Sequence, residues 1–512
     1  MEYYLVINLG LRSIRAIIFD EKVQILAQNW YPVQTVIQGD RVEQDPNEWW
    51  TLCLQLMSEV LQKDPSYKKN LKAITITSSA ACLVVLDKKG VPLTNSLMVS
   101  DKRATAQSAN LKKEKSLETV FTHSKNLAVP SFMFPKILWI KEHLPHIFKQ
   151  RPFFMSSNDF FIYKLTDKVL TDTLNAEKFY YDSKKDQYPP ELLRYMNLNK
   201  KQLPTVVKPG TIAGTLVPSL QKQFGLPQNV KVIVSTYDAI CAFLGSGALA
   251  EGETCNVCGT VSSVRTYTEK NNLHCKNGIL QQQFQTFNIV GGSNNLDGGL
   301  LEWAKDMFYG DSYPEKYVYK IMENEAEASP AGARGLIFSP YIIGERVPFF
   351  DTVTRGIFFG LERFHSRSDI MRSIFEASGY MVHDIIQNIE ESGATVKTIR
   401  MSGGLVQNKV ACKIRANITG KKVSVIKEIE TTSLGALFIM LHTLGKIKRL
   451  SDSTKYVQIG TEYKPDKEAH KLHQKMFTFF KKVYDHNRIL MDERKKLLSI
   501  VDGKEKHILA NL

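Results

Sequence analysis

The sequence lacks any run of about 18 apolar residues, the length that a membrane-spanning helix requires. It also lacks a basic segment followed by an apolar core at its start, because Met1-Glu2-Tyr3 leads directly into a strand-like stretch. These absences argue against a membrane span and against a secretory signal. We therefore expect a cytoplasmic protein with no membrane partner.

Cysteine is scarce, with 7 residues in 512, an odd number scattered through mostly apolar stretches. This usage is typical of a reducing compartment, where disulfides are rare. Cys255 and Cys258 form a lone CxxC inside a strand-like segment, without a second ligand pair. We expect two buried thiols there rather than a zinc site.

Motifs for binding nucleic acid are also missing, since the chain shows no zinc-finger spacing, RNA-binding aromatic motif or arginine-rich arm. The net charge of +15 is spread along the chain. Its C-terminal tail mixes basic and acidic residues, as solvated helix faces do. We interpret the charge as favouring solubility and mildly attracting anionic ligands, and we expect no nucleic-acid partner.

The chain does contain a regular alternation of strands and helices, at a length too great for one core. Its hydrophobic fraction of 43% and charged fraction of 23% are typical of a globular protein. The alternation predicts an α/β fold with two layered domains facing a cleft. The predicted strands are 74–77, 83–87 and 231–235, and the predicted helices are 46–61, 238–244, 299–308, 368–391, 432–444 and a tail after 463.

Gly245-Ser-Gly247 is the best candidate for a domain boundary, because beyond it the second half repeats the opening of the first. We predict an N-terminal domain over 1–245, a C-terminal domain over 246–455 and a helical extension over 456–512.

The repeated feature is a glycine-turn hairpin, found at residues 4–20 and again at 254–265. Gly10 and Gly259 allow backbone N–H groups to approach an anion, and Ser13 and Thr260 supply hydroxyl donors. One such hairpin would indicate only a turn. Two of them, one in each half, predict that a polyphosphate is held from both sides.

A third candidate for ligand binding is the stretch from Ile399 to Asn408, where a short strand runs into Gly403-Gly404 and a helix follows from about Gln407. Paired glycines at a strand-to-helix turn leave room for a flat group or a phosphate against bare backbone. The same pattern is also consistent with a tight turn alone.

Several long segments resemble the signatures of the FGGY carbohydrate kinases. Residues 335–348, 355–361 and 369–376 resemble the C-terminal signature, and Lys136-Ile-Leu-Trp-Ile-Lys-Glu-His143 resembles the core of the N-terminal one. Met133 stands where Pro, Ser or Thr is usual. Within the family, the segments 43–46, 77–87, 92–96 and 291–303 are most similar to gluconokinases and xylulokinases.

The resemblance implies two actin-like (ribonuclease H-like) ATPase domains flanking a cleft. It further implies transfer of the γ-phosphoryl group of ATP, with Mg²⁺, to a hydroxyl group of a small sugar or sugar acid. Gluconate is the first candidate acceptor and D-xylulose the second. Family members are often dimers, so a homodimer is also expected.

The resemblance also assigns site residues. Asp238 stands where the family carries its catalytic base, although an Asp that opens a helix is commonly an N-cap. The residues implied at the nucleotide are Gly10, Ser13, Gly259, Thr260, Gly298, Gly403, Gly404, Leu405 and Asn408. Those implied at the acceptor are Ser79, Ala80, Ala81, Asp101 and Asp238, and those implied at Mg²⁺ are Asn8 and Asp238.

Several positions depart from the family pattern. Asn8 replaces an aspartate that positions Mg²⁺, and an amide oxygen binds this cation without adding charge. Leu11 and Arg12 replace small or hydroxyl residues, and Arg12 either contacts a phosphate or points into solvent. Ala80-Ala81 replaces the pair that grips the sugar. The sequence therefore leaves two hypotheses, an active kinase and a catalytically weakened sensor or scaffold that binds nucleotide or sugar.

Overall fold

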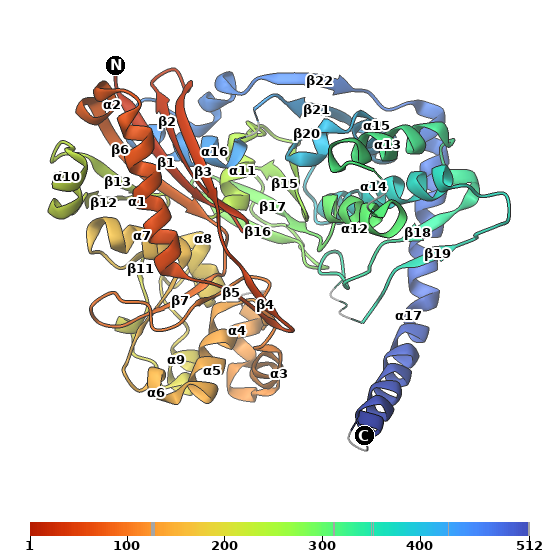
Figure 1. Cartoon of the computed structure of the whole chain (residues 1–512), viewed down its shortest axis with the longest axis horizontal. Helices are drawn as coiled ribbons and strands as arrows, with labels where there is room; N and C mark the ends of the chain where they lie inside the picture. The colour runs from red at the N-terminus through yellow and green to blue at the C-terminus, as the bar shows by residue number, and fades with distance from the viewer. Residues whose placement is uncertain (124–127, 311–312, 350, 352, 429, 510–512) are drawn as a thin grey trace. The chain divides into compact units, whose positions relative to one another are not determined.

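The computed structural model describes residues 1–512 except 124–127, 311–312, 350, 352, 429 and 510–512 (Figure 1). The chain divides into two compact units. Unit 1 comprises Met1–Gly245 and Glu430–Tyr456, and unit 2 comprises Ser246–Ile429 and Val457–Leu512. Each unit is built around its own mixed β-sheet.

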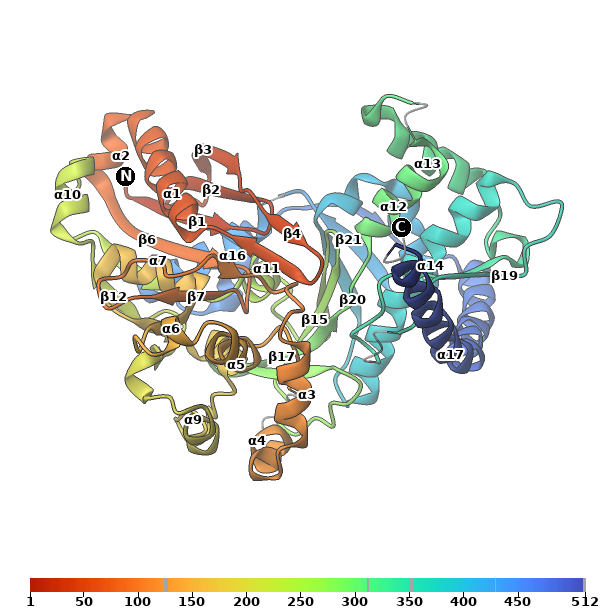
Figure 2. The ribbon, with the colours of Figure 1, turned by 60° about the horizontal axis from the view of Figure 1, so that its bottom comes forward.

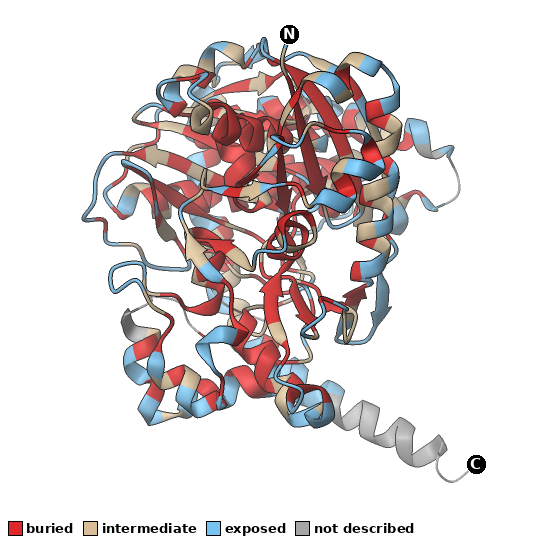
Figure 3. Cartoon of the chain, turned by 90° about the vertical axis from the view of Figure 1, so that its left-hand side faces the viewer, coloured by how far each residue is buried: buried red, intermediate tan, exposed pale blue. Residues whose placement is uncertain are grey.

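The main sheet of unit 1 has six strands in the order β12-β13-β6-β1-β2-β3. β1 runs antiparallel to β2 and parallel to β6, and β6 is also parallel to β13. Every residue of β1 is buried, which matches a sequence that is apolar except at Asn8. Figure 3 shows the buried residues of the chain in red. The strands are β1 (Tyr3–Leu9), β2 (Ser13–Asp20), β3 (Ile25–Pro32), β6 (Leu71–Ser78), β12 (Ile212–Thr215) and β13 (Lys231–Val234).

Helices pack against this sheet and complete the core of unit 1. α1 (Pro46–Gln62) contacts β2 and β3, and α7 (Ser157–Thr166) contacts β6. α11 (Asp238–Gly245) and α16 (Thr431–Thr443) also contact β6 and pack on each other. The predicted start of α1 is confirmed, because the Asp45 carboxylate caps it by accepting the Asn47 N–H at 2.8 Å.

A smaller sheet in unit 1 has the order β4-β5-β8-β7-β9, and β10 pairs with β11. Its strands are β4 (Val36–Gln38), β5 (Arg41–Gln44), β7 (Leu83–Leu86), β8 (Ser96–Leu97) and β9 (Phe153–Ser156), with β10 (Leu170–Asp172) and β11 (Thr205–Val207) beside them. The remaining helices are α2 (Pro65–Asn70), α3 (Thr105–Lys113), α4 (Glu118–His123), α5 (Met133–His143), α6 (Pro145–Phe148), α8 (Thr173–Ala176), α9 (Pro190–Met196) and α10 (Pro218–Phe224).

The main sheet of unit 2 has seven strands in the order β16-β17-β15-β14-β20-β21-β22. Its strands are β14 (Glu253–Cys258), β15 (Ser262–Thr268), β16 (Leu280–Phe284), β17 (Phe287–Ser293), β20 (Thr398–Ser402), β21 (Lys422–Ile426) and β22 (Ile459–Tyr463). A separate pair is formed by β18 (Ile337–Ser339) and β19 (Ile357–Phe359).

The two main sheets share one pairing scheme, which confirms the predicted internal repeat. In unit 1, β3, β2 and β1 pair antiparallel, β1, β6 and β13 pair parallel, and β12 returns antiparallel. Unit 2 repeats this order of strand directions. There, β17, β15 and β14 pair antiparallel, β14, β20 and β21 pair parallel, and β22 returns antiparallel. The glycine hairpins occupy equivalent places in the two schemes.

A long helix, α14 (Arg367–Glu391), forms the centre of unit 2 and contacts β15 and β17 (Figure 2). The other helices of this unit are α12 (Gly298–Phe308), α13 (Glu315–Ala328), α15 (Lys409–Thr419) and α17 (Lys467–Leu509).

The compact units differ from the predicted division in one respect. The prediction placed 430–455 in the C-terminal domain, whereas Glu430–Tyr456 packs within unit 1. The physical reason is the close crossing of α11 and α16. A Cβ atom on Gly245 would collide with the Thr431 carbonyl oxygen, and one on Gly435 would collide with that of Cys241. Only glycine permits this approach.

The predicted C-terminal extension also contains more than helix, because β22 joins the main sheet of unit 2 before α17 begins. Cys255 and Cys258 are both buried, as expected. Within the described part of the chain, no helix combines the length and apolar character needed to span a membrane.

Candidate active site

The carboxyl ends of β1, β6 and β13 lie side by side, because these strands are parallel neighbours. Parallel sheets commonly place their ligand sites at this edge. Asp238 lies four residues beyond β13, at the first position of α11, and Ser79 follows β6. The Ser79 hydroxyl donates a hydrogen bond to Asp238 Oδ2 at 2.9 Å. The other oxygen, Oδ1, accepts the Ala239 N–H at 2.7 Å.

Hydrogen bonds fix the segments that carry Ser79 and Asp238. The Ser79 N–H donates to the Leu9 carbonyl at 3.3 Å, which ties this loop to the end of β1. The Ser157 hydroxyl donates to the Ser79 carbonyl at 3.2 Å. Before Asp238, the Thr236 hydroxyl donates to the buried Asp172 carboxylate at 2.8 Å. Asp238 is half-buried and sits between these fixed segments, where a ligand can reach it.

Ala80 and Ala81 follow Ser79, and Ala81 adopts a positive φ of 58°. The Ala81 carbonyl accepts a hydrogen bond from the Lys136 ammonium at 2.7 Å. The same ammonium donates to the carbonyls of Met98 at 2.7 Å and Leu97 at 3.2 Å. Lys136 is completely buried, and burial lowers the pKa of its ammonium to about 8.

This lysine was not among the predicted site residues, although it lies in the segment that resembles the N-terminal signature. An ammonium carries three N–H donors, and each has a carbonyl acceptor here. The segments carrying Ala81 and Met98 are therefore joined through one side chain. The available signal was a lysine beside apolar residues within that signature-like segment.

Asp101 was predicted to contact the acceptor, and the structure gives its carboxylate other partners. Oδ2 accepts the Val42 N–H at 2.8 Å and the Arg103 guanidinium at 2.6 Å. Arg103 also pairs with Glu43 at 2.6 Å and lies 4.8 Å from the Trp139 ring centroid. Because Asp101 is fully buried in this network, its observed contacts are structural.

The first glycine hairpin ends β1 with Asn8 and Leu9 and turns through Gly10. The Gly10 N–H donates to the Ser13 carbonyl at 2.9 Å, which closes the turn. The Asn8 side-chain amide donates to the Ser433 hydroxyl of α16 at 3.2 Å. This donation leaves the Asn8 Oδ1 oxygen as the atom offered to a cation.

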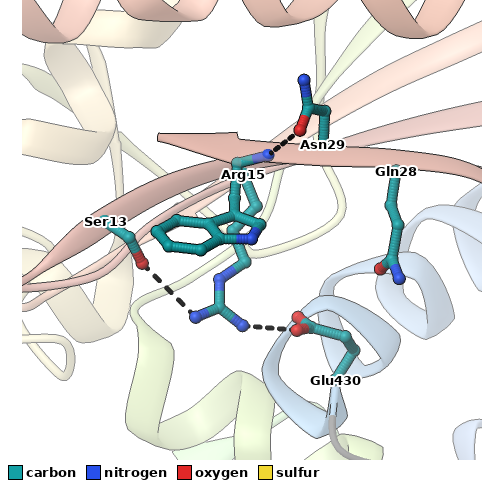
Figure 4. A pocket seen from close by; sticks show the side chains of 6 residues that line it. Ser13, Arg15, Gln28, Asn29 and Glu430 are labelled. Atoms are coloured by element: carbon teal, nitrogen blue, oxygen red, sulfur yellow. Dashed lines mark hydrogen bonds and ion pairs between the residues drawn. The ribbon is translucent and has the colours of Figure 1, made fainter. Parts of the chain in front are cut away.

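A pocket of about 440 Å³ opens beside this hairpin and is lined by Ser13, Arg15, Gln28, Asn29, Trp30 and Glu430 (Figure 4). Arg15 forms an ion pair with Glu430, and its guanidinium donates to the Ser13 hydroxyl at 3.3 Å. Glu430 in turn accepts the Ser433 hydroxyl at 3.2 Å. Arg15 and Glu430 were missed by the sequence reasoning. Their pairing joins residues far apart in the chain, and no local pattern indicates it.

The residues predicted at Mg²⁺ are an amide and a carboxylate. Proteins usually hold Mg²⁺ through one or two carboxylates, with water and substrate phosphates completing its shell. Among the described residues, no group of three or more His, Cys, Asp or Glu side chains is placed to hold a metal by itself. Asn8 and Asp238 therefore suit a cation that arrives with a polyphosphate better than a permanently bound one.

In unit 2, the second glycine hairpin lies against the start of α12. The Gly298 N–H donates to the Gly259 carbonyl at 2.9 Å, and the Gly299 N–H donates to the Thr260 carbonyl at 3.1 Å. A Cβ atom on Gly298 would lie 2.6 Å from the Gly259 carbonyl oxygen. The hairpin tip itself is exposed. The predicted residues Gly259, Thr260 and Gly298 are thus brought together, with bare backbone at the surface.

Gly403 approaches the same hairpin from β20. It adopts a φ of 95°, and a Cβ atom there would collide with the Cys258 carbonyl oxygen. Gly404 is exposed, with no atom within 4 Å of where its Cβ would be. Leu405 is buried. The Asn408 side chain caps α15 by accepting the Ala411 N–H at 2.8 Å.

A second pocket, of about 330 Å³, begins at Gly403. Its lining continues through Val406, Gln407 and Lys409 and is completed by residues of β21, of β22 and of the segment after β21, which includes Lys427 and Glu428. Of the predicted nucleotide residues in this segment, only Gly403 lines the pocket. The sequence reasoning missed the contribution of β21 and β22, which come from later parts of the chain.

A buried ion pair between Arg415 and Asp297 stabilises the start of α12. Arg415 donates to Asp297 at 3.0 Å and to the Asn256 side-chain oxygen at 2.6 Å. Asp297 directly precedes Gly298, and Asn256 lies on β14 just before the hairpin. Losing one partner of such a pair leaves an uncompensated buried charge. Arg415 therefore holds the hairpin and the first turn of α12 in register.

Comparison with known proteins identifies the class that this fold and site define. Residues 3–245 match the N-terminal domain of the FGGY family of carbohydrate kinases, and residues 255–444 match its C-terminal domain. The chain belongs to this family and is a carbohydrate kinase. The resemblance seen in the sequence and the actin-like α/β fold that it implied are both confirmed.

Among individual proteins, the chain is similar to the xylulose kinase of Bacillus subtilis (strain 168), with 24% identity over 96% of this chain and 98% of that protein. It is 24% identical to the gluconokinase of Bacillus licheniformis over 93% of this chain and 94% of that protein. The crystal structure of ligand-bound xylulose kinase from Lactobacillus acidophilus superposes with a TM-score of 0.87 at 22% identity, covering 95% of this chain and 99% of that one.

Proposed function

We propose that this carbohydrate kinase transfers the γ-phosphoryl group of Mg-ATP to a hydroxyl group of gluconate, with D-xylulose as the second candidate acceptor. The observation that carries the proposal is the half-buried Asp238 carboxylate, held by Ser79 and the Ala239 N–H at the carboxyl edge of a parallel sheet. A general base needs this combination of fixed orientation and access.

Asp238 acts as the general base in this scheme. The acceptor hydroxyl gives its proton to Asp238, and its oxygen forms a new bond to the γ-phosphorus. The bond from that phosphorus to the β,γ-bridging oxygen breaks, and ADP leaves. When bound with the nucleotide, Mg²⁺ would neutralise phosphate charge, and Asn8 Oδ1 and Asp238 are the groups that would hold it. The Asn8 amide adds no charge, so the phosphates supply most of the attraction.

Backbone groups account for the proposed recognition of the nucleotide. Gly10 with Ser13, and Gly259 with Thr260, present small turns and hydroxyl donors to phosphate oxygens. Gly298 and Gly403 allow the second of these turns to pack without side chains in the way. The pocket beginning at Gly403, with its apolar wall from Val406 and Val425, suits the adenosine.

A buried lysine that packs on the ring of the residue before Asp238 supports an acidic acceptor. The Lys178 ammonium lies 5.2 Å from the ring centroid of Tyr237, the residue before Asp238, and 5.3 Å from that of Phe132. Ala80 and Ala81 offer no side-chain donors to a sugar hydroxyl, so selectivity has to come from elsewhere. A carboxylate on the acceptor pairs with Lys178, which favours gluconate over the uncharged ketose.

The test couples ADP release to a panel of hexonates, pentuloses, polyols and glycerol with Mg-ATP. We expect turnover that is highest on gluconate and lost in Asp238→Asn. Asn8→Asp should strengthen Mg²⁺ binding and so lower the Mg²⁺ concentration that gives the half-maximal rate. Nucleotide binding without turnover on any acceptor would instead support the sensor or scaffold hypothesis.

Lys178→Met separates the acceptor assignment from the chemistry. We expect its KM for gluconate to rise at least tenfold, while its KM for ATP is unchanged. Lys184→Met, an exposed lysine in the following loop, is the matched control. An equal loss on gluconate and D-xylulose would refute the role given to Lys178 and leave the kinase assignment intact.

A further inference from the structure

The side chain of Asn8 ends in two chemically different atoms, and only one of them suits a cation. Oδ1 accepts hydrogen bonds and can bind Mg²⁺, whereas Nδ2 carries two N–H groups that would repel it. Turning the amide over exchanges the two atoms with little change in shape. Asn8 is buried, so water does not choose between the two orientations. The neighbours of Asn8 therefore decide which atom faces a cation.

The neighbour that contacts this amide is the hydroxyl of Ser433, in the first turn of α16. Asn8 Nδ2 donates to Ser433 Oγ at 3.2 Å, and Ser433 Oγ donates to Glu430 Oε2 at 3.2 Å. A hydroxyl has a single proton to donate. Because Ser433 gives its proton to Glu430, it can only accept from Asn8. The amide must then turn Nδ2 toward Ser433 and Oδ1 away from it.

Glu430 sets the direction of this chain of hydrogen bonds, because an ionised carboxylate accepts and never donates. It forms an ion pair with Arg15, whose guanidinium donates and cannot accept. Arg15 is held in turn by a hydrogen bond to the Ser13 hydroxyl at 3.3 Å (Figure 4). Hydroxyl and amide groups can reverse their roles, but the carboxylate and the guanidinium cannot. The pair of Arg15 and Glu430 therefore leaves Ser433 and Asn8 one consistent arrangement.

We propose that Glu430 is a positioning residue for the cation that accompanies the nucleotide. Acting through Ser433, it orients the Asn8 amide so that Oδ1 faces Mg²⁺. The inference rests on the proposed function, because it concerns the site assigned there to Mg²⁺. It also explains how an uncharged amide can serve at this position. A carboxylate presents an oxygen in either orientation, whereas an amide presents one only when its neighbours fix it.

Glu430→Gln is the direct test of this role. The glutamine amide can donate to Ser433, so the Ser433 proton is released to Asn8 Oδ1 and Nδ2 turns toward the cation. We expect the Mg²⁺ concentration that gives the half-maximal rate to rise about tenfold or more, as is usual when a neighbour that orients a metal ligand is lost. Ser433→Ala removes the acceptor of the Asn8 amide and should give a rise of similar size.

Repeating both changes together with Asn8→Asp separates orientation from charge and from folding. The two oxygens of a carboxylate are equivalent, so Glu430→Gln and Ser433→Ala should then shift the half-saturating Mg²⁺ concentration by less than about threefold. A rise of the same size in both backgrounds would overturn the proposal, because Glu430 would then act through its charge or through stability. Ser453→Ala is the matched control. It removes another buried hydroxyl of unit 1, which donates to the Leu450 carbonyl at 2.6 Å, and should leave the Mg²⁺ requirement unchanged.

Binding of Mn²⁺ in the presence of ADP provides a readout that needs no turnover. Electron paramagnetic resonance measures the free Mn²⁺ as the full chain is titrated. We expect Glu430→Gln to raise the Mn²⁺ dissociation constant about tenfold or more, and by less than about threefold when Asn8→Asp is also present. Equal responses in the two backgrounds, or a wild-type chain that binds no Mn²⁺ with ADP, would refute the positioning role. The expected Mn²⁺ responses in a chain that phosphorylates no acceptor would refute only the proposed function.

Discussion

The Ser79 hydroxyl donates a hydrogen bond to the Asp238 carboxylate across 2.9 Å, joining residues 159 positions apart in the chain. Ser79 is itself held by Leu9 and Ser157, so the carboxylate is oriented by a loop that is already fixed. The Ala239 N–H holds the other oxygen. Asp238 is thus the first residue of a helix and also an oriented carboxylate, which is what the proposed role as base requires.

Ser79→Ala should slow the reaction without weakening nucleotide binding. A hydrogen bond to a charged group contributes about 1.5–3 kcal/mol, so losing this one should lower kcat roughly tenfold or more. Steady-state kinetics and nucleotide titration measure the two effects. Ser66→Ala, on α2, is a matched control. A kcat within twofold of the wild-type value would show that Ser79 does not orient the base.

Lys136→Met should weaken acceptor binding far more than ATP binding. Without the ammonium, the carbonyls of Ala81, Leu97 and Met98 lose a shared donor, and the two segments separate. We expect KM for the acceptor to rise at least tenfold with KM for ATP unchanged. Lys141→Met on the same helix is the control, since that lysine is partly exposed and makes a long hydrogen bond of 3.4 Å to the Tyr195 carbonyl.

The lowered pKa of Lys136 predicts that the KM of the wild-type enzyme for the acceptor depends on pH. Burial lowers the pKa of this ammonium to about 8. Below that pH the charged group supplies three donors, and above it the neutral amine supplies two for three carbonyls. KM for the acceptor should therefore rise as the pH increases through 8. A profile that stays flat to pH 9.5 would rule out this role.

Substituting Gly403 and Gly404, the two glycines that follow β20, should have different effects on the free energy of unfolding. Gly403→Ala places a Cβ against the Cys258 carbonyl at a positive φ, which should cost on the order of 2–4 kcal/mol. Gly404→Ala meets no neighbouring atom and should change stability by less than about 0.5 kcal/mol. Denaturant unfolding followed by tryptophan fluorescence compares the two. Equal midpoints would contradict the packing described for Gly403.

Two buried histidines of unit 2 should each lose their contribution to stability in mild acid. Burial lowers the pKa of His383 and of His473 to about 4, from an ordinary value of 6.5. The unfolded chain takes up these protons first as the pH falls, so each contribution should decline between pH 6.5 and 4, by on the order of 3 kcal/mol per histidine. Burial raises the pKa of Glu345 to about 7 and that of Asp384 to about 6, so these two carboxyls contribute in the opposite direction.

The matching variant is His383→Phe, which keeps a ring against Phe477 and removes one titrating group. Its thermal midpoint should fall less steeply than that of the wild-type chain over this pH range. Lys421 and Lys481 contribute to the lowered pKa of His383, so high salt should reduce the effect. A variant with an unchanged slope would show that His383 does not carry the dependence.

Local patterns in the sequence predicted the elements that carry the site. The Asp45 cap of α1, the two glycine hairpins, and the strand and helix on either side of Asp238 all depend on neighbouring residues, and each is found. The family signatures added the fold class. The protein partners of Asp101 are not given by any local pattern. Its carboxylate is engaged by Val42 and Arg103, a relationship that depends on how β5 and the loop after β8 meet.

The sequence by itself determined that two similar α/β units exist, because hydrophobic periodicity and glycine turns are properties of short stretches. Only the tertiary structure decided that 430–456 returns to unit 1, that Lys136 joins two segments and that Arg15 meets Glu430. These relationships connect residues brought together by packing, and packing depends on shape and burial summed over the whole unit. A linear pattern carries no record of which distant atoms will share one cavity.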